Sequence, residues 1–358
     1  MGIPKLLNLQ LRLTRRCNMT CSHCYTTSNP NLEYDYFPLE KAKELIVDAE
    51  CLGLRIVTLI GGEPFLHPQF KEIIEFVATR NNLTIEVETN GLLLNKYADA
   101  LNDFPRSFAL EISIDGRNTR GVRETELAFK SLEIPIKNAS KCVQTLCSYN
   151  NLHIDFYDIC KKVNEYSIDH VIYMGPSGCG RGRDMTYLTW SDTKSVINKL
   201  NMLKYDNIRI ELPPLITKNI SYGCGWNTYR LEVLPDGNTA TCVQAYYEDP
   251  DKMGLGNVFE SNLEKIWTGN INISALRNIN KTDMSGHCGK CEYWEGCFGS
   301  CRSWAKSWDA EKRWTAPYLR CEEFLIDKDI DDTFHVPNKE IQFLKLPWGG
   351  SEYLPGIK

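Results

Sequence analysis

The chain has 358 residues, 42% of them hydrophobic, and a formal net charge of −5. This length allows two modest domains with a buried core, and the weakly acidic balance gives no sign of nucleic-acid binding. No apolar run reaches the length of a membrane span, and the first residues lack the apolar core of a signal peptide. We therefore expect a cytoplasmic protein that binds neither nucleic acid nor a membrane.

The fifteen cysteines are unevenly placed. Without an export signal, so many cysteines favour bound metal over a disulfide framework. Three lie between residues 17 and 24, and seven lie between residues 224 and 321. For the other five we expect ordinary buried packing; they are Cys51, Cys142, Cys147, Cys160 and Cys179.

Strand and helix patterns alternate from residue 7 to residue 180. The predicted strands are Leu7–Thr14, Arg55–Ile60, Leu83–Glu88, Phe108–Asp115, Lys141–Leu146 and His170–Met174. Helical periodicity lies between them, as in Leu39–Leu52 and Pro68–Thr79. Alternating units of this kind predict an α/β fold with a parallel sheet and right-handed crossovers. A further helix, Ser191–Leu203, and a strand, Asn207–Leu212, are predicted before a Pro-Pro pair.

The predicted strands are polar on one face, which is unusual for strands buried in a parallel sheet. Residues two apart share a face. The polar sets are Asn8, Gln10, Arg12 and Thr14 on the first strand, Glu86, Glu88 and Asn90 on the third, and Glu111, Ser113 and Asp115 on the fourth. If the apolar faces meet the helices, these side chains line the interior. They then bind a ligand, or pair internally through Arg12.

The loop after the first strand carries Cys17, Cys21 and Cys24 at spacings of four and three. Thiolates are soft ligands that suit iron–sulfur clusters and zinc. Three thiolates leave one iron of a 4Fe–4S cube without a protein ligand, so the loop is typical of a reactive site. A three-cysteine zinc knot is the alternative.

The second strand ends in Gly61-Gly62-Glu63-Pro64. Paired glycines let the backbone come close to a ligand. Together with the cysteine loop, this segment resembles the radical S-adenosylmethionine (SAM) superfamily over roughly residues 5–200. The resemblance implies a partial (β/α)6 TIM-type barrel, with its site at the carboxyl ends of the strands.

By this resemblance, the Cys17, Cys21 and Cys24 cluster binds the amino and carboxylate groups of SAM. The segment Gly61, Gly62 and Glu63 would hold the amino group. Ser113 would contact the SAM carboxylate or ribose, and His23 would lie near the adenine. A glycine–arginine segment, residues 175–183, follows the sixth strand. An arginine there binds a substrate carboxylate or is a solvated loop charge.

The seven cysteines of the second set resemble the SPASM extension of radical SAM enzymes. Seven ligands do not divide into four-ligand zinc sites. The resemblance implies two auxiliary clusters, a distal one on Cys288, Cys291, Cys297 and Cys321, and one nearer the barrel on Cys224, Cys242 and Cys301. The fourth ligand of the nearer cluster is a substrate thiol or amine, a non-cysteine side chain or water, or Cys179. We place the radical SAM barrel at 1–215, the SPASM domain at 216–325 and a tail at 326–358.

The two resemblances imply an enzyme with three 4Fe–4S clusters that cleaves SAM to a 5′-deoxyadenosyl radical and removes a hydrogen atom from substrate. The favoured substrate is a ribosomally made peptide, which would be crosslinked, epimerised or oxidised. A small molecule such as a sugar, aminoglycoside or tetrapyrrole is the alternative, and an iron–sulfur electron-transfer protein is the non-enzymatic one. The expected partners are an electron donor such as flavodoxin or ferredoxin and a separate leader-peptide-binding protein.

We expect a carboxylate in the barrel to accept a proton from the substrate. Asp115, Glu88 and Glu111 are the candidates. Asp115 is predicted to lie nearest the reactive rim, and pairing with Arg12 is the expected role of Glu111.

Overall fold

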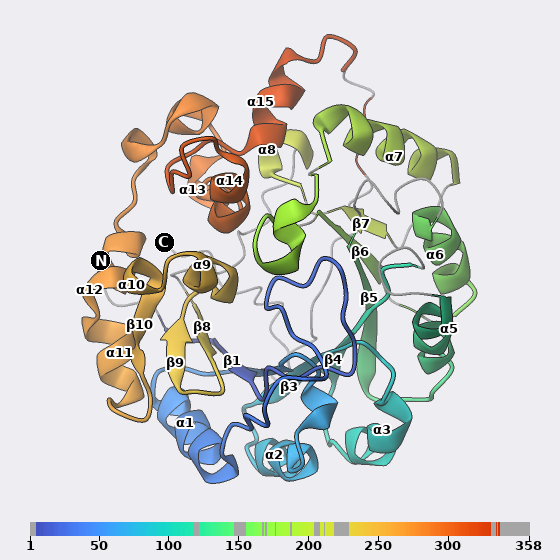
Figure 1. Ribbon diagram of the computed structural model, residues 1–358, viewed down its shortest axis with the longest axis vertical. Coiled ribbons are helices and arrows are strands. Elements are labelled where there is room, and N and C mark those ends of the chain that lie inside the picture. Colours follow the sequence, from blue (N-terminus) through green and yellow to red (C-terminus); the bar gives the residue numbers. More distant parts are fainter. Residues whose placement is uncertain are drawn as a thin grey trace.

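Alternating strands and helices build the first two thirds of the chain into an open parallel barrel, with the helices outside (Figure 1). The computed structural model describes residues 5–116, 122–146, 155–166, 168, 170–175, 177–186, 188–203, 208–210, 212–217, 229–330, 334 and 336. The predicted tail at 326–358 lies mostly outside these residues, as do Cys147 and Cys224.

The strands are β1 (Asn8–Arg12), β2 (Ile56–Ile60), β3 (Thr84–Thr89), β4 (Phe108–Ser113), β5 (Ala139–Leu146), β6 (His170–Met174), β7 (Ile208–Ile210), β8 (Arg230–Val233), β9 (Asn238–Ala240) and β10 (Gly254–Asn257). The helices around the barrel are α1 (Leu39–Cys51), α2 (Phe70–Ala78), α3 (Leu94–Asn102), α5 (Val122–Ser131), α6 (Asp155–Asn164) and α7 (Trp190–Leu203). The later helices are α8 (Pro214–Thr217), α9 (Val243–Glu248), α10 (Pro250–Met253), α11 (Leu263–Gly269), α12 (Ile271–Arg277), α13 (Trp294–Cys297), α14 (Arg302–Trp308) and α15 (Leu319–Ile326). Short 3₁₀ turns are η1 (Pro64–Leu66), η2 (Gly180–Asp184), η3 (Lys281–Asp283) and η4 (Gly286–Lys290).

The described strands form one sheet in the order β10-β9-β8-β1-β2-β3-β4-β5-β6-β7. All pairs from β1 to β7 are parallel, and β8 adds in parallel to the other side of β1, with Leu9 opposite Leu231. Only β9 and β10 are antiparallel additions in the described sheet. The six predicted barrel strands are therefore confirmed. The further predicted strand, Asn207–Leu212, is present as β7 and extends the parallel sheet at one end, and β8, which was not predicted, extends it at the other. This sheet continues across residue 215, where the sequence suggested a domain boundary.

The apolar faces of the strands pack against the outer helices. Leu9, Leu11 and Val57 are fully buried in the same core as Leu45 and Ile46 of α1. The residues that alternate with them point inward and are polar. Asn8, Gln10 and Arg12 are polar, yet no more than 3% of the surface of each residue is exposed. The prediction of a polar barrel interior is therefore confirmed.

A second core joins the cysteine-rich region to the barrel. Trp190 of α7 packs edge-on against Phe324 of α15, with ring centroids 5.1 Å apart. The Trp190 indole N–H also donates to Asp327 (2.7 Å). Trp304 of α14 stacks on Tyr318 at 4.4 Å. These aromatic contacts hold α14 and α15 against the barrel helix α7.

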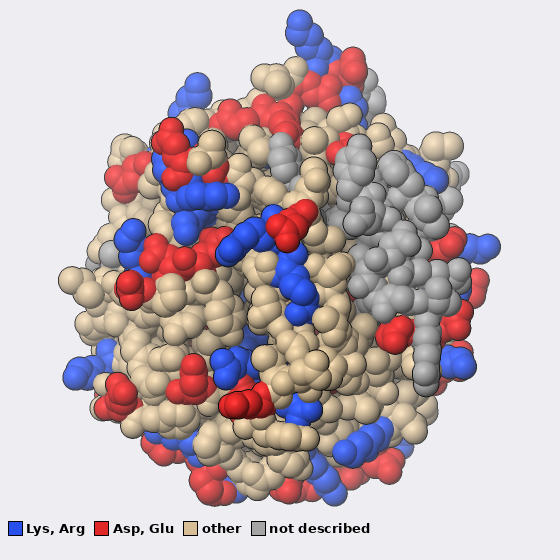
Figure 2. Space-filling view, in the orientation of Figure 1, with Lys and Arg blue, Asp and Glu red and all other residues tan. Residues whose placement is uncertain are grey.

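None of the described helices is long and apolar enough to cross a membrane. On the face shown in Figure 2, the described acidic and basic side chains lie interspersed. This pattern is that of an ordinary solvated surface.

Leu231→Ala should test whether β8 folds as part of the barrel. Leu231 is fully buried in the core shared with β1, so the truncation should cost roughly 2–5 kcal/mol of the free energy of unfolding. Differential scanning calorimetry of the anaerobically prepared protein should show the first cooperative transition shifted as a whole. Leu127→Ala, at a side chain that is 40% exposed, is the matched control. A shift confined to a separate late transition would contradict a shared core.

Candidate active site and metal centres

The first cysteine loop lies across the carboxyl ends of the barrel strands (Figure 1). Cys17 is buried, and Cys21 and Cys24 are partly exposed. Burial, and after it the negative charges of Glu63, Cys21 and Cys24, raise the pKa of the Cys17 thiol to about 12. The three thiols are therefore electrostatic neighbours. Asn90 adds an amide N–H 3.7 Å from the Cys17 sulfur.

Gly61 and Gly62 let the end of β2 touch the backbone of this loop. The Gly62 N–H donates to the Thr14 carbonyl (2.7 Å), and the Glu63 N–H donates to the Arg16 carbonyl (2.9 Å). A Cβ at Gly62 would lie 2.2 Å from the Arg16 carbonyl oxygen, so a side chain cannot be accommodated there. The glycines thus permit a close approach to the cysteine loop, and because both also border the cavity, their contact with a ligand stays a prediction.

The carboxylate of Glu63 is fully buried. One oxygen accepts from Thr89 Oγ1 (2.8 Å) and the Phe65 N–H (3.3 Å), and the other accepts from the Asn90 N–H (2.9 Å). These bonds hold the end of β3 beside the end of β2. Direct contact between Glu63 and a ligand stays a prediction.

A cavity of about 190 Å³ opens between the cysteine loop and the strand ends. Its walls combine the three thiols with polar groups from the barrel interior. The residues that the sequence analysis singled out and that line it are Cys17, Cys21, Cys24, His23, Gly61, Gly62, Glu88, Ser113 and Asp115. The structure therefore brings together nine of the eleven residues predicted for the SAM and substrate site, and Glu63 and Glu111 are the two that do not line this cavity.

Asp115 and His23 both line this cavity, and their side chains contact each other. His23 Nε2 lies 3.2 Å from one carboxylate oxygen of Asp115, and the other oxygen accepts from the Leu146 N–H (2.9 Å). The carboxylate is thus occupied by two protein groups. His23, which was predicted to lie near the adenine, is therefore held by Asp115, which was predicted to accept a proton from the substrate.

Glu88 borders the cavity deep in the barrel. Burial, and then the charge of Glu86, raise the pKa of Glu88 to about 7, while Arg230 and Arg12 act in the opposite direction. Glu232 adds a further negative charge nearby. Glu88 is therefore a carboxyl group that changes charge near neutral pH.

The interior arginine has a different carboxylate partner from the one we expected. Arg12 lies 3.7 Å from Glu232 of β8, and it donates to the Gly61 carbonyl (2.8 Å) and the Tyr25 hydroxyl (3.0 Å). Glu111 accepts a hydrogen bond from Gln144 of β5.

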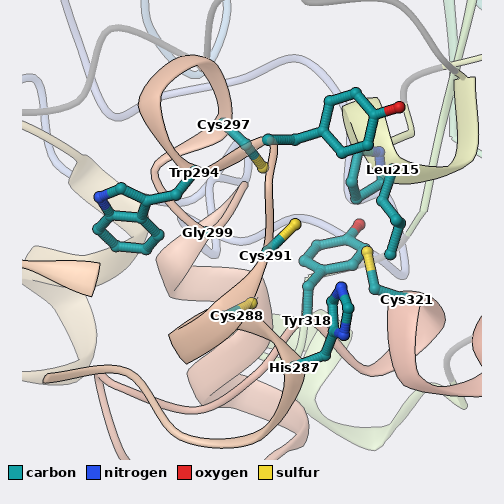
Figure 3. Close-up of a pocket in the computed structure, with 11 residues that line it drawn as sticks. Leu215, His287, Cys288, Cys291, Trp294, Cys297, Gly299, Tyr318 and Cys321 are labelled. Carbon is teal, nitrogen blue, oxygen red and sulfur yellow. The ribbon is translucent and has the colours of Figure 1, made fainter. Parts of the chain in front are cut away.

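Four of the second-set cysteines surround one small hollow of about 20 Å³ (Figure 3). The sulfurs of Cys291, Cys297 and Cys321 point toward it. Burial raises the pKa of Cys297 to about 11, and the charges of Cys288 and Cys291 act in the same direction. Among the described residues, no three His, Cys, Asp or Glu side chains close on a single metal ion. Four mutually close thiols with mainly apolar neighbours fit the donor set of a 4Fe–4S cluster.

Cys242 and Cys301 each precede a helix, α9 and α14. Cys224, the third ligand predicted for this cluster, lies outside the described residues. Cys179 is buried, and its sulfur lies 3.2 Å from Ser177 Oγ. Its ligation of a cluster stays a prediction.

Tyr25, Gln144 and Glu232 belong to this site but were not predicted from the sequence. Tyr25 directly follows Cys24 in the loop, whereas Gln144 and Glu232 lie on strands next to predicted ones, opposite Ser113 and Gln10. Glu232 could have been found from the alternation Arg230, Glu232 in a short strand, but nothing in the sequence indicates that β8 pairs with β1.

Two family models match the chain. Residues 11–178 match the radical SAM superfamily, and residues 224–292 match SPASM, an iron–sulfur cluster-binding domain. The second range includes four of the seven cysteines in the second set.

Two relatives match most of the chain. The antilisterial bacteriocin subtilosin biosynthesis protein AlbA of Bacillus subtilis is 25% identical over 325 residues, which cover 83% of this chain and 67% of AlbA. The mycofactocin maturase MftC of Mycobacterium ulcerans is 23% identical over 321 residues, which cover 84% of each chain.

The fold is similar to that of SuiB from Streptococcus suis. The structure of SuiB bound to S-adenosylmethionine superposes with a TM-score of 0.70 at 15% identity, over 89% of this chain and 78% of SuiB. The structure bound to precursor peptide SuiA gives a TM-score of 0.68 at 16% identity, over 84% and 72%.

Replacing Cys291 and Cys297 together with alanine should empty the hollow of Figure 3. The protein, reconstituted anaerobically, should lose about a third of its iron if three 4Fe–4S clusters are bound. Iron and sulfide assays measure this loss. Cys51→Ala, at an exposed cysteine on α1, should leave the iron content unchanged. An unchanged iron content in the double variant would contradict a cluster at this place.

Proposed function

Because this chain belongs to the radical SAM superfamily and carries a SPASM iron–sulfur cluster-binding domain, we propose that it uses SAM to modify a ribosomally synthesised peptide oxidatively. One observation carries this proposal. A single cavity is lined both by the thiols of Cys17, Cys21 and Cys24 and by the polar ends of the barrel strands. A cluster and its substrate would therefore meet in one cavity.

The cavity walls fit the proposed ligands. The three thiols would hold a 4Fe–4S cluster with one iron free for SAM, and Gly61, Gly62 and Ser113 border the same space. When bound, this cluster and SAM would supply a 5′-deoxyadenosyl radical that removes a hydrogen atom.

The second set of cysteines would hold two further clusters, with an external donor such as flavodoxin or ferredoxin supplying electrons. An auxiliary cluster is the proposed acceptor for the electron that the substrate loses after hydrogen abstraction. The four thiols of Figure 3 support the distal cluster. The exchangeable fourth ligand on the nearer cluster and a separate leader-binding protein are parts of this proposal.

The peptide class of substrate is inferred from the relatives. AlbA takes part in subtilosin biosynthesis, MftC is a mycofactocin maturase, and SuiB was solved with a precursor peptide. The test incubates the enzyme, SAM and a reductant with a short peptide encoded beside its gene. Loss of two hydrogens from the peptide, seen by mass spectrometry, is expected. No mass change in any such peptide would contradict an oxidative modification of the peptide.

We propose that Glu88 accepts the substrate proton. Asp115 is held by His23 and the Leu146 N–H, and Glu111 accepts from Gln144. Glu88 instead borders the cavity, where its charge is influenced by Glu86, Arg230, Arg12, Glu232 and Tyr25. Removal of a hydrogen atom and then an electron leaves a proton, which the Glu88 carboxylate takes up.

Replacing Cys17, Cys21 and Cys24 together with alanine should abolish SAM cleavage and remove about a third of the iron. The measurement is 5′-deoxyadenosine by liquid chromatography, with a strong reductant present. Cys51→Ala should behave as the wild type because this cysteine lies on the exposed side of α1. Undiminished 5′-deoxyadenosine from the triple variant would end the assignment of SAM cleavage to this loop, and a wild-type protein that forms no 5′-deoxyadenosine would leave electron transfer as the function.

Glu88→Gln should uncouple SAM cleavage from product formation. SAM is still cleaved, but little product forms because no carboxylate accepts the substrate proton. In the wild type, product per 5′-deoxyadenosine should rise as the pH increases through about 7, since the carboxylate form exists above its pKa. The glutamine variant should lose this rise. Glu126→Gln, at an exposed site on α5, is the control. Product loss in Asp115→Asn, with normal product in Glu88→Gln, would assign the role to Asp115 instead.

A further inference from the structure

The segment that follows β6 lies against the first cysteine loop (Figure 1). It contains Ser177, Cys179 and the turn η2, and it joins the barrel to α7. The sequence offered two roles for an arginine here, a substrate ligand or a solvated charge. Arg183 is exposed, whereas Arg181 borders the cavity and makes its hydrogen bonds to the first cysteine loop, and a contact of Arg181 with substrate stays a prediction.

Arg181 holds three carbonyl groups of the cysteine loop. Its Nε donates to the Cys21 carbonyl (2.7 Å), and a terminal guanidinium nitrogen donates to the Ser28 carbonyl (2.8 Å). Its backbone N–H donates to the Cys24 carbonyl (3.0 Å). The bonded carbonyls span the loop from its second cysteine to beyond its third. One residue therefore fixes the loop from a segment about 160 positions later in the chain.

Gly180 makes this close contact feasible. Its φ angle is +55°, and a Cβ there would lie 2.4 Å from the Tyr25 carbonyl oxygen and 2.6 Å from that of Cys24. Any side chain would push the segment away from the loop and lengthen the hydrogen bonds of Arg181. Gly180 thus allows the segment to come close enough for Arg181 to hydrogen-bond to the loop.

The opposite side of the segment touches the cysteine-rich region. Ser177 Oγ donates to Gln244 Oε1 (2.9 Å), two residues after Cys242. A Cβ at Gly178 would lie 2.8 Å from the Cβ of Ser307, which belongs to the helix that begins after Cys301. The segment is therefore packed between the first cysteine loop and the helices that follow two cysteines of the second set.

The charge of Arg181 has no carboxylate counterpart within 4 Å among the described residues. Its hydrogen bonds go to neutral carbonyl groups, and its side chain is only partly exposed. A cation in this position is more stable if an anion lies nearby. A cluster held by three thiolates is such an anion, and it would sit in the loop that Arg181 binds.

We propose that Arg181 is a positioning residue that clamps the Cys17–Cys24 loop and offsets the negative charge of its cluster. The segment around Arg181 also ties this loop to the helices after Cys242 and Cys301, so the two cysteine regions keep a fixed relative position. The proposal rests on the proposed function in assigning a cluster to this loop. It assigns Arg181 no contact with substrate.

Three variants separate the clamp from the charge. Arg181→Ala removes both, and Arg181→Lys keeps the charge without the planar fork. Arg183→Ala is the matched control, because Arg183 lies in the same turn but is exposed. Each reconstituted protein is treated anaerobically with an iron chelator, and iron release is followed with time. The variant without Cys17, Cys21 and Cys24 identifies the phase that belongs to this loop.

Iron in that phase should leave Arg181→Ala about ten- to a hundredfold faster, because charge-assisted hydrogen bonds that hold the loop closed are lost. Arg181→Lys should fall between Arg181→Ala and the wild type, and Arg183→Ala should match the wild type. The melting temperature should be the same in all four proteins. Equal release rates in Arg181→Ala and the control would overturn the clamp.

The reduction potential of the loop's cluster provides an independent readout. It should become more negative in Arg181→Ala, since the reduced cluster carries more negative charge, and it should stay near the wild-type value in Arg181→Lys. An unchanged potential in Arg181→Ala would overturn the charge role. A wild-type cluster that does not respond to SAM in its electron paramagnetic resonance spectrum would refute the proposed function. Iron release needs no SAM and would still decide whether Arg181 is a clamp.

Discussion

A buried cation at the centre of the barrel connects the parts of this protein. Arg12 is only 2% exposed, and among the described residues its Nε has no hydrogen-bond partner. Burying such a charge is costly unless it is paired, and removing one partner of a buried pair costs roughly 3–5 kcal/mol. The partners of Arg12 are Tyr25 in the cysteine loop, the Gly61 carbonyl at the end of β2 and Glu232 on β8. Satisfying one guanidinium therefore brings the loop, the strand end and the later strand together.

The cysteine loop depends on three such attachments rather than on its own secondary structure. Arg12 donates a hydrogen bond to the Tyr25 hydroxyl, and the Glu63 N–H donates to the Arg16 carbonyl. Arg181 donates to the Cys21 carbonyl. Loops without regular structure leave backbone groups to be satisfied elsewhere. Here several of those groups are satisfied by the strand ends and by Arg181, so contacts from outside the loop hold its shape.

Local patterns predicted this protein well, whereas contacts distant in sequence were not predictable. The strands over Arg55–Ile60 and His170–Met174 and the polar interior were evident from alternation, because each depends on neighbouring residues. The pairing of β8 with β1 and the partner of Arg12 depend on residues more than two hundred positions apart. The glycines after β2 were identified from the need for close approach, and the structure shows such an approach to the backbone of the cysteine loop, while their contact with SAM stays a prediction.

The place of β1 in the sheet has a consequence for how the chain reaches its folded state. Its two neighbours are β2, about fifty residues later, and β8, more than two hundred residues later. During synthesis from the ribosome, one edge of β1 therefore stays unpaired until most of the chain has emerged. Such an edge can pair with another chain, and closing so long a loop slows folding. The polar residues Asn8, Gln10 and Arg12 make this unpaired edge of β1 less prone to aggregation than the edge of an apolar strand would be.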